Sequence, residues 1–463
     1  MSFPLWEKAK QITSAAIDAV RPDRLINDNL KRDGDQLEIQ GRTFDLAEFE
    51  AVDIIAFGKA APGMAAAVTD ILGNRLRRGI IAGLPGFAFE HPRFERFEAS
   101  HPLPDERSEA AARAALELAR RSGPSDLLVL LVSGGGSSLL CAPLPGISLA
   151  DKMCVTRELL VRGADIRELN IVRKHLSAVK GGRLALAAKA GVVNLIISDV
   201  VGDDPEVIAS GPGYWDSSTF AEAVRILSKF DYYEAGPAGV KAAFESGLAG
   251  GLEETLKKND AAFDRVSAFL VGCNAVALAA AKREAEAAGF QAMVLAGADS
   301  GEARDAAARY IPSLLASVRS RGRSDRPLAL IAGGEHTVTV RGKGLGGRNQ
   351  EFVLAVLVEL ERRARAGARS DRETFGEFLK NGRLNGRDWL VLSLGTDGVD
   401  GPTEAAGAWA GPATLVKLQP SGLNLAVRLD DNDSYNVFKK IGGLIVTGPT
   451  GTNVMDLRLI LVD

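Results

Sequence analysis

Cysteine is scarce in this sequence of 463 residues. Its three cysteines, Cys141, Cys154 and Cys273, lie far apart and form no C-x-x-C pair. This argues against a disulfide framework and against a structural zinc site. The four histidines, which also lack metal-ligand spacing, are His91, His101, His175 and His336. A structural role or a substrate contact suits each of them better than metal ligation.

Charge of either sign is not in excess. The chain carries 56 Lys and Arg against 59 Asp and Glu, for a net charge of −3. No global electrostatic argument therefore favours nucleic acid or a membrane as a partner. The locally basic stretch 362–372 contains an acid and no aromatic residue, which favours a solvated helix end or loop.

No long apolar run is suited to a membrane. Residues 127–150 carry no charge, but glycines, serines and two prolines, Pro143 and Pro145, interrupt them. Residues 1–20 have the pattern of an amphipathic helix and not of a signal peptide, because charges interrupt any apolar core. We therefore expect a cytoplasmic protein.

Several catalytic motifs are also missing. The sequence contains no G-x-x-x-x-G-K-[ST], no H-E-x-x-H and no G-x-S-x-G. These absences exclude a P-loop NTPase of the usual form, a zincin and the usual nucleophile elbow of an α/β-hydrolase.

Short apolar runs alternate with Ala- and Leu-rich helical patterns along the chain. Several runs are apolar without alternation, as in strands that are buried on both faces of a parallel sheet. The pattern predicts an α/β fold, doubly wound, with right-handed crossovers. The candidate strands are residues 52–57, 79–84, 127–132, 192–198, 268–272, 292–297, 328–333 and 389–394.

The length suggests two or three domains, at roughly 150 residues per domain. Residues 235–265 are rich in glycine and charge, and a new strand–helix unit opens at 268. We therefore expect an N-terminal domain over 1–240 and a C-terminal domain over 265–463. Residues 363–388 have the composition of a surface insertion.

Polar and glycine-rich segments follow the apolar runs. Ligands of open α/β sheets collect at the carboxyl ends of strands, and exposed amides before a helix suit phosphate or carboxylate. A single such turn is weak evidence, whereas six are much stronger. They begin at Gly58, Ser133, Asp199, Gly334, Thr396 and Pro449. Asp199, Asp397 and Asp400 offer oxygen ligands of the kind that Mg²⁺ prefers.

Two cations stand out near these turns. Lys59 lies in a Gly/Ala turn and has few packing reasons to be there, although a plain surface lysine remains an alternative. Residues 342–347 match G-x-G-x-x-G, but no strand ending in an acidic residue follows about twenty residues later. We interpret this segment as an anion loop and not as an NAD site. Arg348 beside it suits phosphate or carboxylate, or else a salt bridge at the helix end.

Together these segments closely resemble the class II glycerate 2-kinase family, the group with a C-terminal MOFRL domain. Some members of that family were labelled hydroxypyruvate reductases. The resemblance runs nearly end to end and rests on nine ordered motifs. They are AFGKAAPGMA, SHPLPDE, VSGGGSSLL, NIVRKHLSAVKGGRLA, ISDVVGDDPEVIASGP, GGEHTVTVRGKGLGGRNQE, GTDGVDGPTEAAGA, DNDSY and TGPTGTNVMDL.

The resemblance implies a Rossmann-like N-terminal domain, a MOFRL region over about 326–463 and an active site in the interdomain cleft. It further implies that ATP, with Mg²⁺, phosphorylates the 2-hydroxyl of D-glycerate in a monomer or homodimer. The catalytic residues would be Lys59, Arg348 and Asp199, and the metal ligands Asp199, Asp397 and Asp400. We expect nucleotide, phosphate or substrate contacts from Gly58, Ser133, Gly134, Gly135, Gly136, Ser137, Ser138, Lys180, Glu335, Asn349, Gln350, Thr450, Thr452 and Asn453.

Two departures from the family pattern bear on specificity. Gly213-Tyr214-Trp215 follows ASGP, where the family usually has Thr and a Pro/Asp-rich turn, and His336 stands where a threonine is common. The main alternative function is an NAD(P)H-dependent hydroxypyruvate reductase. A ligand-binding regulator is a weaker one, because four candidate catalytic residues lie at strand ends.

Overall fold

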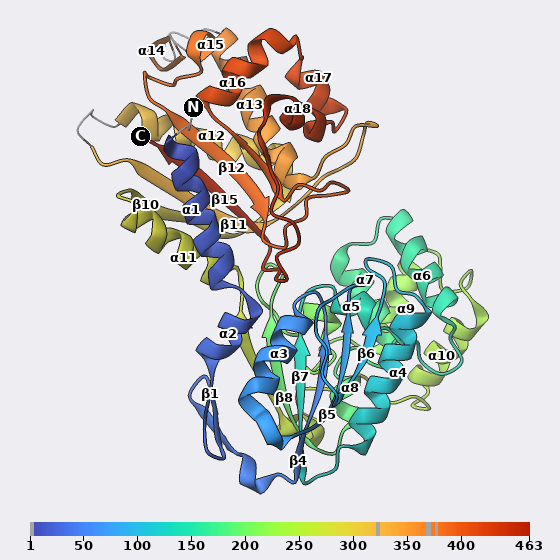
Figure 1. Cartoon of the computed structure of the whole chain (residues 1–463). Coiled ribbons are helices and arrows are strands. Elements are labelled where there is room, and N and C mark those ends of the chain that lie inside the picture. The colour runs from blue at the N-terminus through green and yellow to red at the C-terminus, as the bar shows by residue number, and fades with distance from the viewer. Residues whose placement is uncertain (1–3, 321–324, 367–371, 376–377) are drawn as a thin grey trace. The chain divides into compact units, whose positions relative to one another are not determined.

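The computed structural model describes residues 4–320, 325–366, 372–375 and 378–463. The chain forms two compact units. The central unit is Pro22–Gly272, and the terminal unit combines Met1–Arg21 with Cys273–Asp463. Figure 1 labels the elements of both units.

The central unit is built on a six-stranded parallel sheet. Its order is β6-β5-β4-β7-β8-β9, which is the 3-2-1-4-5-6 order of a Rossmann fold. The predicted doubly wound sheet is therefore confirmed. The strands are β4 (Ala51–Phe57), β5 (Leu76–Gly83), β6 (Phe94–Glu98), β7 (Asp126–Val132), β8 (Gly191–Ile197) and β9 (Val266–Gly272).

Helices cover both faces of this sheet, as Figure 1 shows. All seven residues of β7 are buried, which explains why its sequence is apolar without alternation. The helices are α2 (Pro22–Asn29), α3 (Ala61–Leu72), α4 (Glu106–Arg121), α5 (Gly136–Leu139), α6 (Leu149–Val161), α7 (Ile166–His175), α8 (Arg183–Ala187), α9 (Phe220–Lys229) and α10 (Ala238–Leu248). A small antiparallel sheet of β1 (Leu30–Asp33), β2 (Gln36–Ile39) and β3 (Arg42–Asp45) precedes β4.

The terminal unit holds a mixed six-stranded sheet of order β10-β11-β15-β12-β13-β14. Only β10 and β11 pair in parallel, and β15 runs antiparallel to both of its neighbours. The strands are β10 (Gln291–Glu302), β11 (Leu328–Thr337), β12 (Trp389–Gly395), β13 (Gly407–Ala410), β14 (Leu444–Ile445) and β15 (Asp456–Val462). The eight candidate strands all exist, whereas β15, the third strand in this sheet, was not among them.

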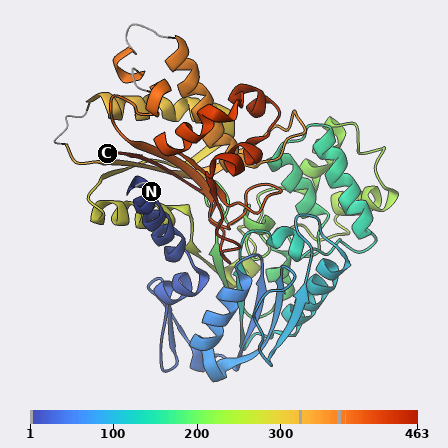
Figure 2. The ribbon, with the colours of Figure 1, turned by 45° about the horizontal axis from the view of Figure 1, so that its top comes forward.

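Helices also flank the mixed sheet. Figure 2 shows α1 and α11 on one face and α12 and α13 on the other. The helices are α1 (Pro4–Ala19), α11 (Asn274–Ala287), α12 (Ala303–Ser320), α13 (Arg348–Ala366), α14 (Arg372–Phe375), α15 (Phe378–Asn381), α16 (Pro412–Leu418), α17 (Leu425–Asp430) and α18 (Ser434–Ile441). Part of the expected insertion, at 367–371 and 376–377, lies outside the described residues.

The compact units differ from the expected domains at both ends. Helix α1 belongs to the terminal unit because its apolar face is buried there, where Trp6 stacks on Trp409 and Lys8 donates to the carbonyl of Ala288. Strand β9 completes the sheet of the central unit, although its sequence was expected to open the C-terminal domain. The segment 235–265, where the composition changes, lies inside the central unit and contains α10, whose Val240, Ala243 and Phe244 are buried.

Among the described residues, no helix combines the length and the apolar character that crossing a bilayer requires.

Candidate active site

The switch point of the parallel sheet brings the first two predicted turns together. Strands β4 and β7 are neighbours, with Phe57 paired to Val132, and their connections leave in opposite directions along the sheet. The amide of Lys59 donates to the carbonyl of Gly134 (2.8 Å), and the amide of Ala60 donates to Ser133 Oγ (3.0 Å). Open α/β sheets bind ligands at this position.

The glycines of this region are required first by the chain itself. A Cβ at Gly58 would overlap Ser133, and one at Gly136 would press on Phe57 and Ala209. Gly135 has φ +79°, and a Cβ there would lie 3.0 Å from the ring of His101 and 3.4 Å from Lys59 Cγ. Lys59 and His101 therefore both lie over the glycine turn, and the sequence motifs did not single out His101 for this place.

Ser137 is the centre of a polar cluster beside the turn. Lys180 Nζ donates to the Oγ (2.7 Å) and carbonyl (2.6 Å) of Ser137, and Arg173 Nη2 donates to the same Oγ (2.7 Å). Ser210 Oγ lies 3.2 Å from it. Ser138, in contrast, is buried and returns a hydrogen bond to Gly135, so its role is to shape the turn.

Asp199 follows β8, the next strand of the same sheet. Because β7 and β8 are parallel, Asp199 lies at the edge that carries Lys59 and Ser133. Its side chain is half-buried. The structure thus brings together at one edge the predicted residues of the central unit.

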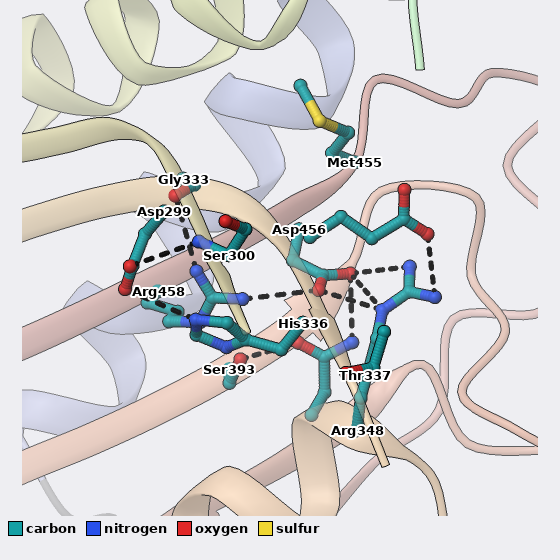
Figure 3. A network of polar contacts seen from close by, with 12 residues as sticks. Asp299, Ser300, Gly333, His336, Thr337, Arg348, Ser393, Met455, Asp456 and Arg458 are labelled. Carbon is teal, nitrogen blue, oxygen red and sulfur yellow. Dashed lines mark hydrogen bonds and ion pairs between the residues drawn. The ribbon is translucent and has the colours of Figure 1, made fainter. Parts of the chain in front are cut away.

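In the terminal unit, Arg348 is held between two carboxylates. Its Nε and Nη2 donate to Asp456 at 2.8–3.1 Å, and its Nη1 lies 2.8 Å from Glu335 Oε1. Figure 3 shows Asp456 between Arg348 and Arg458. Burial works to lower the pKa of Arg348, but Asp456, Glu335 and Asp400 outweigh it and raise that pKa above its ordinary value. The result is a fixed, permanently charged guanidinium.

Asp400 caps helix α13. Its carboxylate accepts from the backbone amides of Asn349 (3.0 Å) and Gln350 (2.9 Å). The side-chain amides of the same two residues also donate to it. Burial raises the pKa of Asp400 to about 6, despite the opposing amide hydrogen bonds. The helix N-terminus therefore already holds an anion, and Asp400 has a structural role in place of the expected metal ligation.

The expected ligand contacts of Asn349 and Gln350 are likewise made within the chain. Both are buried, and Asn349 donates to Asp456 (3.0 Å) and accepts from Ser393 (2.5 Å). The glycines of 342–347 pack against their own unit as well. A Cβ at Gly344 would overlap the backbone of Asp431 and one at Gly347 that of Asp400. The glycines of this segment, which was expected to be an anion loop, therefore allow it to pack closely against the backbone of Asp431 and Asp400.

The C-terminal turn is also tied internally. Thr450 donates to the carbonyl of Thr396 (2.6 Å), and the buried Thr452 donates to that of Val20 (2.6 Å). Asn453 accepts from the amide of Met455 (3.2 Å). Thr452 thereby anchors α1 to this turn, a role that its predicted ligand contact did not anticipate.

Asp456 was not among the predicted residues, because only carboxyl ends of strands were considered. It begins β15, which is antiparallel, and pairs with Gly334 near the end of β11 and with Gly395 at the end of β12. The first residue of β15 therefore lies at the same sheet edge as the last residues of β11 and β12. The signal was the charged residue Asp456 next to an apolar run in TGPTGTNVMDL.

Asp456→Asn tests this positioning role. The variant keeps the shape but removes the charge that orients Arg348, so kcat should fall about 10–100-fold, since misplacement by about 1 Å costs this much. Losing a buried ion-pair partner should also lower the unfolding free energy by about 3 kcal/mol. Steady-state kinetics and urea unfolding measure the two effects, and wild-type kcat would contradict the role.

Comparisons with known proteins show the family of this chain. A family model described as "Domain of unknown function (DUF4147)" matches residues 8–245, and the model of the "MOFRL family" matches 328–456. The chain is 40% identical to a protein named glycerate 2-kinase from Pyrococcus horikoshii, over 100% of this chain and 98% of that one. It is 39% identical to a D-glycerate 2-kinase from Thermotoga maritima, over 99% and 98%.

This chain belongs to the class II glycerate 2-kinase family.

Solved structures of class II glycerate 2-kinase relatives share its fold. A glycerate kinase from Thermotoga maritima superposes with a TM-score of 0.81 at 38% identity, covering 99% of this chain and 100% of that one. The PH0495 protein of Pyrococcus horikoshii gives 0.79 at 39% identity, covering 100% and 99%. A protein from Agrobacterium vitis named putative hydroxypyruvate reductase is 40% identical over 88% of this chain and 86% of that one.

His336, one of the two expected departures from the pattern of the glycerate 2-kinase family, is buried in the network of Figure 3. Its Nε2 lies 3.2 Å from Asp299, which also accepts from Arg309 and Tyr310. Burial, with Arg458 nearby, lowers the pKa of His336 to about 4. The ring is therefore neutral at pH 7 and supports β11 from within.

His336→Thr should change how stability depends on pH. Unfolded histidine binds a proton below about pH 6.5, whereas the buried ring does so only below about 4, so its contribution is lost as pH falls from 6.5 to 4. From pH 7 to 5 the loss is about 2 kcal/mol. We expect the free energy of unfolding, measured with urea at pH 7 and at pH 5, to fall by about 2 kcal/mol less in His336→Thr than in wild type. If the free energy of unfolding depended on pH equally in both proteins, the lowered pKa of His336 would be contradicted.

Proposed function

We propose that this protein is a glycerate 2-kinase that transfers the γ-phosphoryl group of ATP to the 2-hydroxyl of D-glycerate. The observation that carries the proposal is the 39% identity, over nearly the whole of both chains, to a D-glycerate 2-kinase. The two cations expected for phosphoryl transfer support it. Lys59 lies at the switch point of the parallel sheet, and Arg348 is held by Asp456 and Glu335.

Phosphoryl transfer depends on positioning and on neutralising the charge that spreads over the phosphoryl oxygens. In this proposal Lys59 and Arg348 supply fixed positive charge to those oxygens. Arg348 suits this role because its carboxylate partners fix the guanidinium before substrate arrives, so no reorganisation is needed in the transition state. Asp199 either accepts the proton of the 2-hydroxyl or holds the metal ion.

The acidic residues at the strand ends fit a magnesium ion only in part. Asp199 of the central unit and Asp397 of the terminal unit are half-buried carboxylates that follow β8 and β12, and each would offer such an ion an oxygen ligand. Asp400 does not fit, because its oxygens accept from helix amides. Within the described residues, no group of three or more His, Cys, Asp or Glu could hold a metal. Magnesium usually takes one or two carboxylates plus substrate phosphates, whose charge it neutralises when bound.

A two-arm assay tests the proposal. The protein is supplied with D-glycerate, ATP and Mg²⁺, and separately with hydroxypyruvate and NADH. We expect 2-phosphoglycerate in the first arm, identified by the position of the phosphate in ³¹P–¹H NMR, and no oxidation of NADH in the second. Oxidation of NADH without any nucleotide turnover would favour a reductase, and phosphate on the 3-hydroxyl would overturn the assigned position.

A further inference from the structure

Two cations of the central unit contact Ser137, and a third, Lys152, lies close enough to act on them electrostatically. Lys180 and Arg173 both donate to Ser137 Oγ at 2.7 Å, and Lys152 on α6 acts electrostatically on Lys180. Lys180 is 1% exposed and Lys152 is 3% exposed. Lys152 Nζ is buried and has no oxygen or nitrogen hydrogen-bond partner among the described residues, and its side-chain neighbour is the thiol of Cys141. We call Lys152, Arg173 and Lys180 the cation cluster.

No carboxylate balances this cluster. Across the described part of the chain, no Asp or Glu forms an ion pair with Lys152, Arg173 or Lys180. Lys174, the neighbour of Arg173 on α7, differs from the cluster in this respect. It is buried too, but its Nζ lies 3.0 Å from Asp216 and 3.2 Å from Glu206. A buried lysine nearby thus has carboxylate partners, whereas the three residues of the cation cluster have none among the described residues.

Burial without a counter-charge is costly. Burial lowers the pKa values of Lys152, Arg173 and Lys180, and the repulsion from Arg173 lowers those of the two lysines further. Cys141, whose backbone follows α5, is the one group whose charge would raise them. A buried charge is usually paired or coordinates a ligand, since isolation costs several kcal/mol. The lowered pKa values mean that burial disfavours the charged forms of the lysines in the free protein, and a bound anion would favour those charged forms.

We propose that the cation cluster is the subsite for the phosphate groups of the nucleotide donor. This inference rests on the proposed function. The cluster adjoins the glycine turn that ends β7, at the switch point where doubly wound sheets bind nucleotides. Three cations without a carboxylate match a multiply charged phosphate chain better than the single carboxylate of glycerate. Lys152 and Arg173 are thereby assigned to nucleotide binding alongside Lys180.

Lys152→Met and Arg173→Gln test the subsite in the full-length protein. Each should weaken ADP binding in isothermal titration calorimetry about tenfold to hundredfold, the loss that corresponds to one charged hydrogen bond. KM for D-glycerate should change less than threefold. Arg167→Gln is the matched control, because it removes an exposed arginine from the same helix, and ADP should bind to it as to wild type.

Lys152→Met also has a readout that does not depend on turnover. Methionine replaces an unpaired buried lysine with an apolar chain of similar length, so the ligand-free protein should melt at the same or a higher temperature than wild type. The rise in melting temperature that ADP causes should shrink. A lower melting temperature with an unchanged ADP effect would show a purely structural lysine and overturn the proposal.

The outcomes separate this inference from the proposed function. If wild type phosphorylates glycerate and the two variants bind ADP normally, the subsite is wrong and the function stands. If the variants instead raise KM for D-glycerate and leave ADP affinity unchanged, the cluster binds the substrate carboxylate and the nucleotide assignment is wrong. If wild type does not phosphorylate glycerate, the proposed function itself fails.

Discussion

Replacing Arg348 with alanine is expected to lower kcat about 10³–10⁵-fold, the range that a transition-state arginine contributes to phosphoryl transfer. Among the described residues, the same change leaves Asp456, which is 0% exposed, with the side chains of Asn349 and Arg458 as its hydrogen-bond donors. Breaking a buried ion pair from one side costs about 3–5 kcal/mol. Steady-state kinetics and chemical unfolding of Arg348→Ala measure the two losses.

Two further variants make this result interpretable. Arg348→Lys keeps the charge but cannot donate in the bidentate arrangement now made to Asp456, so it should recover part of the stability and little of kcat. Arg362→Ala removes an exposed arginine from the same helix, whose partner is Glu359, and should behave as wild type. Turnover of Arg348→Ala within tenfold of wild type would remove Arg348 from the catalytic residues.

Lys59→Ala should reduce kcat about 10²–10³-fold, as expected when one preorganised donor to the transition state is lost. The fold should survive, because the backbone amide of Lys59, and not its side chain, makes the bond to Gly134. We expect the melting temperature to stay within a few degrees of wild type. If ADP affinity is also retained, the loss belongs to the chemical step and not to nucleotide binding.

Lys189→Ala is a suitable control for Lys59→Ala. Lys189 is an exposed lysine of the same unit, and its removal changes the net charge equally. Its kcat should equal that of wild type. If Lys59→Ala matched this control, Lys59 would be the plain surface lysine that the sequence left open.

The central unit could be predicted well from its sequence. Strands buried on both faces have continuous apolar runs, so β4, β7 and β8 stand out, and the residues just after them lie at one edge once the strands are parallel. The turns at Gly58, Ser133 and Asp199 were located in this way. Arg173 and Lys152 were missed because they lie on helices, where a charged residue usually faces water.

The terminal unit was harder to predict from the sequence. A residue's position along a strand indicates the sheet edge only if the strand direction is known, and antiparallel β15 reverses it for Asp456. Asn349 and Gln350 looked like ligand contacts because polar residues at a helix start suit anions, and Asp400 looked like a metal ligand because Mg²⁺ prefers carboxylate oxygens. The structure shows that Asp400 is itself the anion.

The amino-acid sequence by itself determined the positions of the main strands, the glycine turns and the family, since these depend on local pattern and ordered motifs. Only the tertiary structure decided which charges meet, because Arg348 at the start of helix α13 pairs with Asp456 at the start of strand β15, 108 positions away, and only the packing of helix on sheet brings them together. The same holds for the cation cluster. Burial turns ordinary lysines into costly charges, and burial is settled only when the helices pack.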